Sequence, residues 1–181
     1  MAHRLFVGVD LPALVREALH RLQFGVRSAR WVAPENLHLT LRFIGDVDGR
    51  QAQDIHDALT ALNARSFTIE LRDAGCFGPG KRPRALWAGV APSRELDELK
   101  LRVDGLLARA GVPPDSRRYW PHVTLARLRN DAAREIGARI AEISPAVAGA
   151  FEVEELILFQ SHKSTSGSYY SREAAYPLRP S

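Results

Sequence analysis

The chain has 181 residues, of which 45% are hydrophobic and 25% charged, as is typical of a folded globular protein rather than a disordered one. Its net charge of +4 includes 22 Arg against 3 Lys, which indicates either genomic base composition or recognition of phosphate groups by guanidinium. A single cysteine excludes an internal disulfide, and no signal peptide or membrane-spanning apolar run is found, so we expect a cytoplasmic protein.

The first half of the chain predicts the order strand, helix, strand, helix, strand. Residues 4–11 are rich in branched and aromatic side chains, which favours a strand. Pro12 then opens a helix in which apolar residues recur at helical spacing, namely Leu14, Ala18, Leu19 and Leu22. The next elements are a strand alternating from Leu37 to Phe43, a helix at 48–64 capped by Asp48, and a hairpin of strands at 66–77 and 84–91 around the loop 78–84.

The same order of elements begins again near residue 84. A helix at 94–111 ends at Gly111, and the later elements are a linker at 112–119, a strand at 120–128, a helix at 131–143, a strand at 151–161, a turn at 164–167 and a last strand at 169–178. No Gly/Ser-rich linker separates the halves. We therefore expect an α+β fold in a single domain, 1–181, with repeat halves of about 1–83 and 84–181 and antiparallel sheets.

Two of the predicted strands carry the pattern His-x-Thr, "HLTL" from His38 and "HVTL" from His122. Side chains two apart on a strand share a face, so His38 lies beside Thr40, and His122 beside Thr124, while the intervening residues face the core. With 6 His and 5 Thr in the chain, chance predicts about 0.17 such pairs. Two copies at equivalent places in the two halves therefore favour a functional site.

Three chemistries fit two histidines that face one another. A zinc site needs further ligands, and the strands that carry the pattern offer no nearby carboxylate. Nucleophilic catalysis by Cys76 lacks a paired base in the sequence. General acid–base catalysis fits best, because imidazole can be protonated or neutral near pH 7. Phosphodiester cleavage requires a base for the incoming oxygen and an acid for the leaving one, on opposite sides of phosphorus.

The fifth residue after each histidine differs, being Phe43 in the first copy and Arg127 in the second. In an ideal strand this position points away from the histidine, so a twist or a bulge is needed to bring either side chain into the site. Arg127 would then neutralise phosphoryl oxygens, or else it is a solvated strand end. Phe43 would stack on a nucleobase, or else it packs in the core.

The stretches "RWVAPENLHLTLRFIGDV" and "WPHVTLARL" closely resemble the two-histidine phosphoesterase superfamily. Within it, the best resemblance is to the bacterial and archaeal RNA 2′,3′-cyclic phosphodiesterases, also called 2′-5′ RNA ligases. The segments "LFVGVDLP" and "FGPGKRPRALWAGV" and the final pair of strands extend the resemblance to nearly the whole chain. It implies two pseudo-twofold-related lobes of antiparallel sheet and helices, with the active site in the groove between them.

The resemblance also implies an activity, namely hydrolysis of RNA 2′,3′-cyclic phosphate ends to 2′-phosphomonoesters without metal or other cofactor. It assigns His38 and His122 as the catalytic pair, and of these we expect neutral His122 to activate water and protonated His38 to protonate the leaving O3′. Its phosphate-binding residues correspond to Thr40, Thr124 and Arg127, and its nucleoside-binding aromatic residue corresponds to Phe43. The loop arginines Arg82 and Arg84 either contact RNA or are solvated.

Three alternatives remain open at this point. The protein could act as a 2′-5′ RNA ligase on tRNA halves, or hydrolyse another cyclic phosphate such as that of ADP-ribose. It could also be a module that binds a nucleotide without turnover. As partners we expect RNA with 2′,3′-cyclic phosphate ends, including tRNA fragments, and no membrane; a monomer is the expected state.

Overall fold

The structure is a computed structural model that describes residues 2–79, 82–129, 133–144, 146–165 and 167–181. The predicted loop 78–84, helix 131–143 and turn 164–167 each include positions outside these ranges, at 80–81, 131–132 and 166. The secondary structure, in chain order, is β1 (His3–Asp10), α1 (Ala13–Arg21), β2 (Arg30–Trp31), the 3-10 turn η1 (Pro34–Asn36), β3 (His38–Val47), α2 (Gly49–Thr60), β4 (Phe67–Phe77), β5 (Ala85–Val90), α3 (Arg94–Arg109), β6 (His122–Arg127), α4 (Ala133–Ile143), β7 (Ala146–Val153), β8 (Glu155–Ser164) and β9 (Gly167–Pro177).

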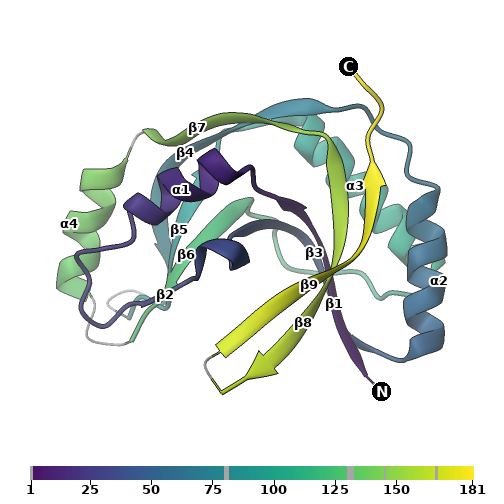
Figure 1. The fold of residues 1–181 in the computed structure, drawn as a ribbon, viewed down its shortest axis with the longest axis horizontal. Helices are drawn as coiled ribbons and strands as arrows, with labels where there is room; N and C mark the ends of the chain where they lie inside the picture. The colour runs from purple at the N-terminus through teal and green to yellow at the C-terminus, as the bar shows by residue number, and fades with distance from the viewer. Residues whose placement is uncertain (1, 80–81, 130–132, 145, 166) are drawn as a thin grey trace.

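The strands form one antiparallel sheet in the order β7-β4-β5-β6-β3-β1-β8-β9, and β2 adds to β6. The sheet divides where β3 meets β6, because these two strands are joined through one residue pair, Leu39 opposite Val123. We call the strands β3, β1, β8 and β9 the terminal lobe and the strands β6, β5, β4 and β7 the central lobe (Figure 1). The predicted α+β fold with two antiparallel lobes is confirmed.

Each lobe takes strands from both halves of the sequence. The central lobe contains β4, from the first half, because β4 forms a hairpin with β5. The terminal lobe contains β8 and β9, from the second half, because β8 pairs with β1. The two spatial lobes thus differ from the sequence halves 1–83 and 84–181. The division into these halves describes the order of elements along the chain and stays a prediction.

The helices cover the lobes in pairs (Figure 1). α1 packs against β7 and α4 against β4, whereas α2 and α3 pack together against the terminal lobe. The Asp48 side chain accepts a hydrogen bond from the Gln51 N–H at 2.8 Å, so the predicted cap of α2 is confirmed. The predicted apolar face of α1 is confirmed at Leu19, which is buried, but it was wrong at Leu14, which is 77% exposed, since α1 buries Val15 instead.

The single strand predicted at 151–161 was also wrong. The structure breaks it at Glu154, where β7 ends and β8 begins. The break occurs because β7 pairs with β4 in the central lobe and β8 pairs with β1 in the terminal lobe. The predicted strand is therefore two strands, and the chain crosses from one lobe to the other between them.

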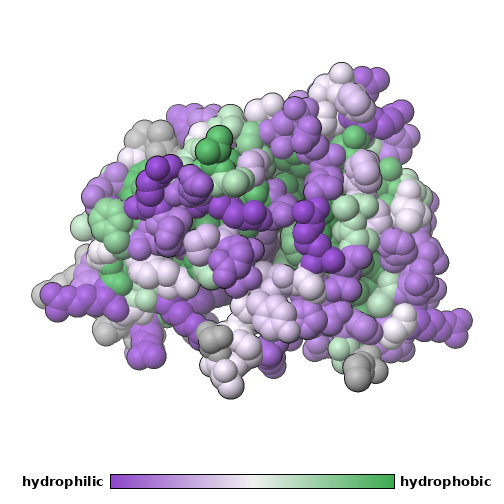
Figure 2. All heavy atoms as spheres, in the orientation of Figure 1, coloured by the Kyte–Doolittle hydropathy of each residue, from purple (hydrophilic) through white to green (hydrophobic). Residues whose placement is uncertain are grey.

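Hydrophilic residues cover most of the face shown in Figure 2, and hydrophobic residues show there as separate patches. The core lies between the sheet and the helices, and its most deeply buried side chains include Val7, Leu39, Ile55, Leu86 and Val123. None of the helices in the described ranges combines the length and the apolar composition that a membrane span requires.

Candidate active site

A cavity of about 570 Å³ lies at the junction of the two lobes. Its lining includes all six side chains singled out in the sequence, namely His38, Thr40, Phe43, His122, Thr124 and Arg127. The structure thus brings both His-x-Thr patterns to one groove, as the pairing of β3 with β6 requires.

Strand alternation places the histidines and threonines in the groove. Leu39 and Val123, the middle residues of the two patterns, are fully buried and lie opposite one another where the lobes meet. Their neighbours on either side therefore point to the opposite face, which is the face of the groove. The same apolar contact that joins the lobes orients the candidate catalytic residues.

A β-bulge in β3 brings Phe43 into the groove. The register with β1 passes from Thr40 opposite Gly8 directly to the next pair at Arg42, so Leu41 has no partner in β1. Leu41 and Arg42 are consequently both buried, and Phe43 returns to the groove face with 53% of its surface exposed. The bulge that the sequence analysis required for this position is present.

A second bulge, at the equivalent place in β6, brings Arg127 into the groove. The register with β5 passes from Thr124 opposite Trp87 to the next pair at Ala126, so Leu125 has no partner in β5. Leu125 and Ala126 are both fully buried, and Arg127 is exposed and lines the cavity. Arg127 is thus available to an anion in the groove.

The main chain fixes the orientation of both imidazoles. The Nδ1 atom of His38 lies 2.7 Å from the Asn36 carbonyl oxygen, and that of His122 lies 2.6 Å from the Trp120 carbonyl oxygen. A carbonyl oxygen can only accept a hydrogen bond, so Nδ1 carries the proton in each ring. Nε2 is therefore the nitrogen that remains for proton transfer in both histidines.

Aromatic rings surround His38 in the terminal lobe. Its ring centroid lies 4.8 Å from that of Phe6 and 5.8 Å from that of Phe159, and the edge contact with Tyr170 is at 4.9 Å. Phe6 also contacts Phe43, at 5.8 Å. His38 therefore has a largely apolar environment.

His122 has fewer aromatic neighbours in the central lobe. Phe77 makes an edge contact with its ring at 4.8 Å, and Trp87 lies 6.3 Å away. The two sides of the groove are thus similar in kind, with an imidazole held between a carbonyl oxygen and aromatic rings, but they are not identical.

Burial lowers the pKa of His38 to about 4, because the charged ring loses hydration. The Asn36 carbonyl and the Asp10 carboxylate oppose this shift, and the charges of His122 and Arg127 add to it. Burial also lowers the pKa of His122, and Arg127 contributes in the same direction. Both imidazoles are therefore neutral at pH 7 in the free protein.

One charged group distinguishes the two histidines. Asp10 lies directly opposite His38 in the pairing of β1 with β3, whereas Gly89 occupies the equivalent place opposite His122. Directly opposite residues in an antiparallel pair share a face, so the Asp10 carboxylate lies on the side of His38. Asp10 also forms ion pairs with Arg16 and Arg172. The environment of His38 thus includes a carboxylate that the central lobe does not reproduce.

Sequence reasoning missed several residues that line the cavity, among them Arg4, Phe6, Asn36, Phe77, Arg117 and Tyr170. Asn36 and Phe77 belong to stretches that resembled the family, so their proximity to the motifs was a usable signal. Tyr170 also lies in such a stretch, the final pair of strands, but it lies on β9, two strands from β1, so no local pattern placed it beside His38.

The other chemistries considered gain no geometric support. Cys76 is exposed on β4 and does not line the cavity. Within the described ranges, no group of three His, Cys, Asp or Glu side chains is placed to hold a metal ion. The remaining histidines make polar contacts elsewhere, in the pairs His3 with Gln160, His20 with Gln23, His56 with Tyr176 and His162 with Ser171.

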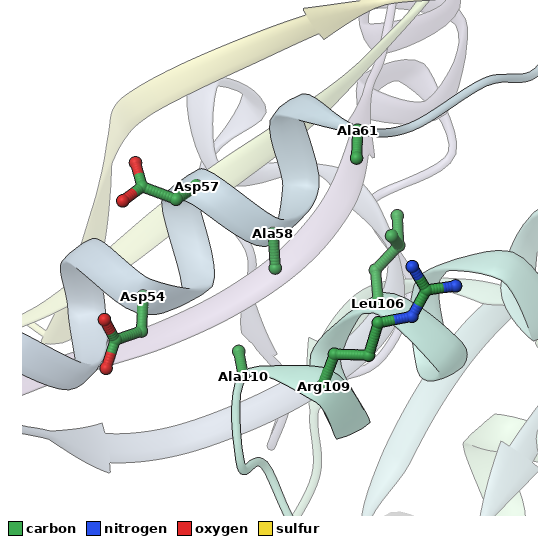
Figure 3. Close-up of a pocket in the computed structure, with 7 residues that line it drawn as sticks. All are labelled: Asp54, Asp57, Ala58, Ala61, Leu106, Arg109 and Ala110. Carbon is green, nitrogen blue, oxygen red and sulfur yellow. The ribbon is translucent and has the colours of Figure 1, made fainter.

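A second pocket, of about 350 Å³, lies between α2 and α3 (Figure 3). Ala58, Ala61 and Ala110 form its small apolar wall, and the carboxylates of Asp54 and Asp57 lie on α2. Its lining also includes Leu106 and Arg109 but no histidine. We interpret this pocket as a crevice left by small side chains where two helices pack.

Comparison with known proteins shows that the chain is similar to phosphoesterases. The family model described as LigT like Phosphoesterase matches residues 9–87 and 89–170. Proteins named RNA 2′,3′-cyclic phosphodiesterase are similar in sequence. That of Aeropyrum pernix is 36% identical over 77% of this chain and 80% of its own length, and that of Methanothermobacter thermautotrophicus is 31% identical over 98% and 100%.

Solved structures agree with these relatives. The structure of E. coli LigT complexed with 3′-AMP superimposes with a TM-score of 0.83 at 30% identity, covering 98% of this chain and 99% of that one. Usb1 of Kluyveromyces marxianus, at 14% identity and a TM-score of 0.54, shares the fold.

Proposed function

Because this chain belongs to the LigT-like phosphoesterase family, we propose that it hydrolyses RNA 2′,3′-cyclic phosphate ends to 2′-phosphomonoesters. The observation that carries the proposal is the pair of imidazoles in one groove, each with Nδ1 bound to a carbonyl oxygen and Nε2 left for proton transfer. In-line displacement at phosphorus needs one proton acceptor and one proton donor on opposite sides, and this pair supplies both without a metal ion.

The other groove residues have roles that follow from their chemistry. Thr40 and Thr124 would donate hydrogen bonds to the phosphoryl oxygens, and Arg127 would neutralise their charge as it increases in the transition state. Phe43 would stack on the nucleobase of the cyclic nucleotide, since it is exposed in the groove on the His38 side. The 3′-AMP complex of the E. coli relative supports a nucleotide as the ligand.

For the two histidines, we propose that His38 protonates the leaving O3′ and that His122 activates the water. Burial keeps both neutral in the free protein, and a bound phosphate anion raises the pKa of both by Coulomb attraction. Asp10 stabilises the imidazolium of His38, whereas Gly89 offers His122 no such charge. We base the assignment of the acid to His38 on this carboxylate, which opposes the lowering of the His38 pKa by burial.

The activity is tested with nucleoside 2′,3′-cyclic monophosphates in buffer containing EDTA. We expect turnover to the 2′-monophosphate, identified by ³¹P NMR. His38→Ala and His122→Ala should each lower kcat by about 10²- to 10⁴-fold, because each removes a proton-transfer group. Tight binding without turnover by the unaltered protein would instead indicate a nucleotide-binding module.

The roles of the histidines are tested with a cyclic phosphate in which sulfur replaces the bridging O3′. A thiolate leaves without a proton, so this substrate does not need the acid. We expect it to restore most of the lost rate to His38→Ala and little to His122→Ala. The reverse pattern would exchange the two assignments while leaving the proposed reaction intact.

We further propose that the protein acts as a monomer in the cytoplasm on RNA fragments such as those of tRNA. One chain supplies every residue assigned above, so the reaction does not need a second copy. Light scattering tests the monomer, since it gives the molar mass in solution. Competition between tRNA fragments and mononucleotides for turnover tests the RNA substrate.

A further inference from the structure

Two exposed aromatic side chains near His122 are not used by the mechanism above: Phe77 lines the groove, and Trp120 precedes His122 by two residues. Phe77 is 37% exposed and Trp120 is 48% exposed. Both pack against Trp87, with ring centroids 5.3 and 6.1 Å away. Single exposed aromatic residues are ordinary on protein surfaces, but two that share a support beside a candidate catalytic histidine form a local surface.

The Trp87 ring supports Phe77 and Trp120 from below and is itself tightly packed. A Cβ atom placed on Gly75 would lie 2.4 Å from the Trp87 ring, and one placed on Gly89 would lie 3.2 Å from it. The indole therefore rests directly on the backbone of β4 and β5, in space that larger side chains would fill. Phe77 and Trp120 are held against an indole that has little room to move.

Positive charge accompanies the aromatic rings. The guanidinium of Arg118 lies over the Trp120 ring, 5.8 Å from its centroid. Arg84, whose N–H donates to the Phe77 carbonyl oxygen at 2.6 Å, is exposed, as is Arg82. Aromatic faces beside arginine are the combination that single-stranded nucleic acid binds, because bases stack on the rings and phosphates attract the cations.

The base stacked on Phe43 leaves this surface free. Phe43 belongs to the terminal lobe, where it contacts Phe6, and Phe77 belongs to the central lobe, where it contacts His122. The proposed substrate places phosphorus between the two histidines, so one base occupies the side of His38 only. A mononucleotide therefore fills less of the groove than its aromatic lining allows.

We propose that Phe77, Trp120 and Arg118 bind the base of a second nucleotide, the one preceding the nucleotide that carries the cyclic phosphate in single-stranded RNA. The inference rests on the proposed function, and it specifies the substrate as an oligonucleotide end rather than a mononucleotide.

The test compares kcat/KM for a dinucleotide and a mononucleotide that carry the same 2′,3′-cyclic phosphate nucleoside. We expect the unaltered protein to prefer the dinucleotide by about tenfold, the effect of one stacked base. Trp120→Ala and Arg118→Ala should each reduce this ratio, and Trp120→Phe should keep most of it because the ring remains. All three retain the main-chain carbonyl that holds His122. Leu101→Ala, an exposed apolar change on α3, is the control and should leave the ratio unchanged.

Equal kcat/KM values for the two substrates in the unaltered protein would overturn the inference, as would an unchanged ratio in Trp120→Ala. Calorimetric titration of the His38→Ala variant with the same two compounds gives the comparison without turnover. If the unaltered protein hydrolyses neither compound, the proposed function fails, and the ratio of the two dissociation constants still decides whether the second base is bound.

Discussion

At the scale of single residues, the site depends on carbonyl oxygens placed two positions before each histidine. The Asn36 and Trp120 carbonyls select the same tautomer in both rings, so both present Nε2 to the groove. The two histidines then differ through their neighbours. Asp10 and three aromatic rings adjoin His38, whereas Arg127 lowers the pKa of both rings.

The lowered pKa of His38 predicts a pH-dependent stability. In the unfolded chain a histidine takes up a proton near pH 6.5, whereas folded His38 does so only near pH 4. Between these values the unfolded state binds more protons, so the free energy of unfolding falls as the pH falls. From pH 7 to pH 5 we expect His38 to account for a loss of about 2 kcal/mol.

Urea unfolding at the two pH values measures this loss. His38→Gln should lose less stability than the unaltered protein between pH 7 and pH 5, and His20→Gln, a surface change on α1, should behave as the unaltered protein does. An equal loss in His38→Gln and the unaltered protein would show that His38 titrates normally when folded.

At the scale of the elements, two bulges and two glycines shape the groove. The bulges at Leu41 and Leu125 reverse the alternation of β3 and β6 at equivalent places, so that the fifth residue after each histidine faces the groove. Gly75 and Gly89 leave space for the Trp87 ring on the central lobe.

The close approach of Trp87 to β4 predicts the effect of Gly75→Ala. The new methyl group would lie 2.4 Å from a rigid ring, so Trp87 must move. We expect a loss of about 1 to 3 kcal/mol in the free energy of unfolding, as overpacking produces, and a change in tryptophan fluorescence.

Gly105→Ala is the matched control for this substitution. A Cβ at Gly105 in α3 meets no atom within 4 Å, and alanine favours a helix more than glycine does, by about 1 kcal/mol. We therefore expect this variant to be at least as stable as the unaltered protein. A stable Gly75→Ala variant with unchanged fluorescence would contradict the tight packing of Trp87.

At the scale of the whole molecule, the lobes depend on one another for their strands and helices. The strands β8 and β9 complete the terminal lobe after the chain has built the central lobe, and α1 leaves β1 to pack on β7. Neither lobe is a separate stretch of the sequence, so neither can fold as a simple chain fragment.

This arrangement predicts one cooperative unfolding transition. Fluorescence and far-UV circular dichroism should give the same midpoint in urea, and the calorimetric and van't Hoff enthalpies should agree. Leu39→Ala, which removes the fully buried contact with Val123 between the lobes, should lower the free energy of unfolding by about 2 to 5 kcal/mol while the transition stays single. Two separate transitions would show that the lobes fold independently.

The sequence by itself determined the α+β class, most of the helices and strands, and the two His-x-Thr pairs that meet in the groove, while Phe43 and Arg127 were assigned to the site through the family resemblance. It could do so because these features depend on local periodicity: His38 and Thr40 share a face through strand alternation, and Asp48 caps α2 with its own side chain. The requirement for a bulge before Phe43 and Arg127 also followed from alternation alone.

Only the tertiary structure decided which lobe each strand joins, because pairing partners far apart in the chain leave no local pattern. The strand predicted at 151–161 breaks at Glu154 because β7 and β8 belong to different lobes. For the same reason Tyr170 reaches His38, and Asp10 adjoins one histidine while Gly89 lies opposite the other. Long-range packing thus made two sequence patterns that look alike into two chemically different sides of one groove.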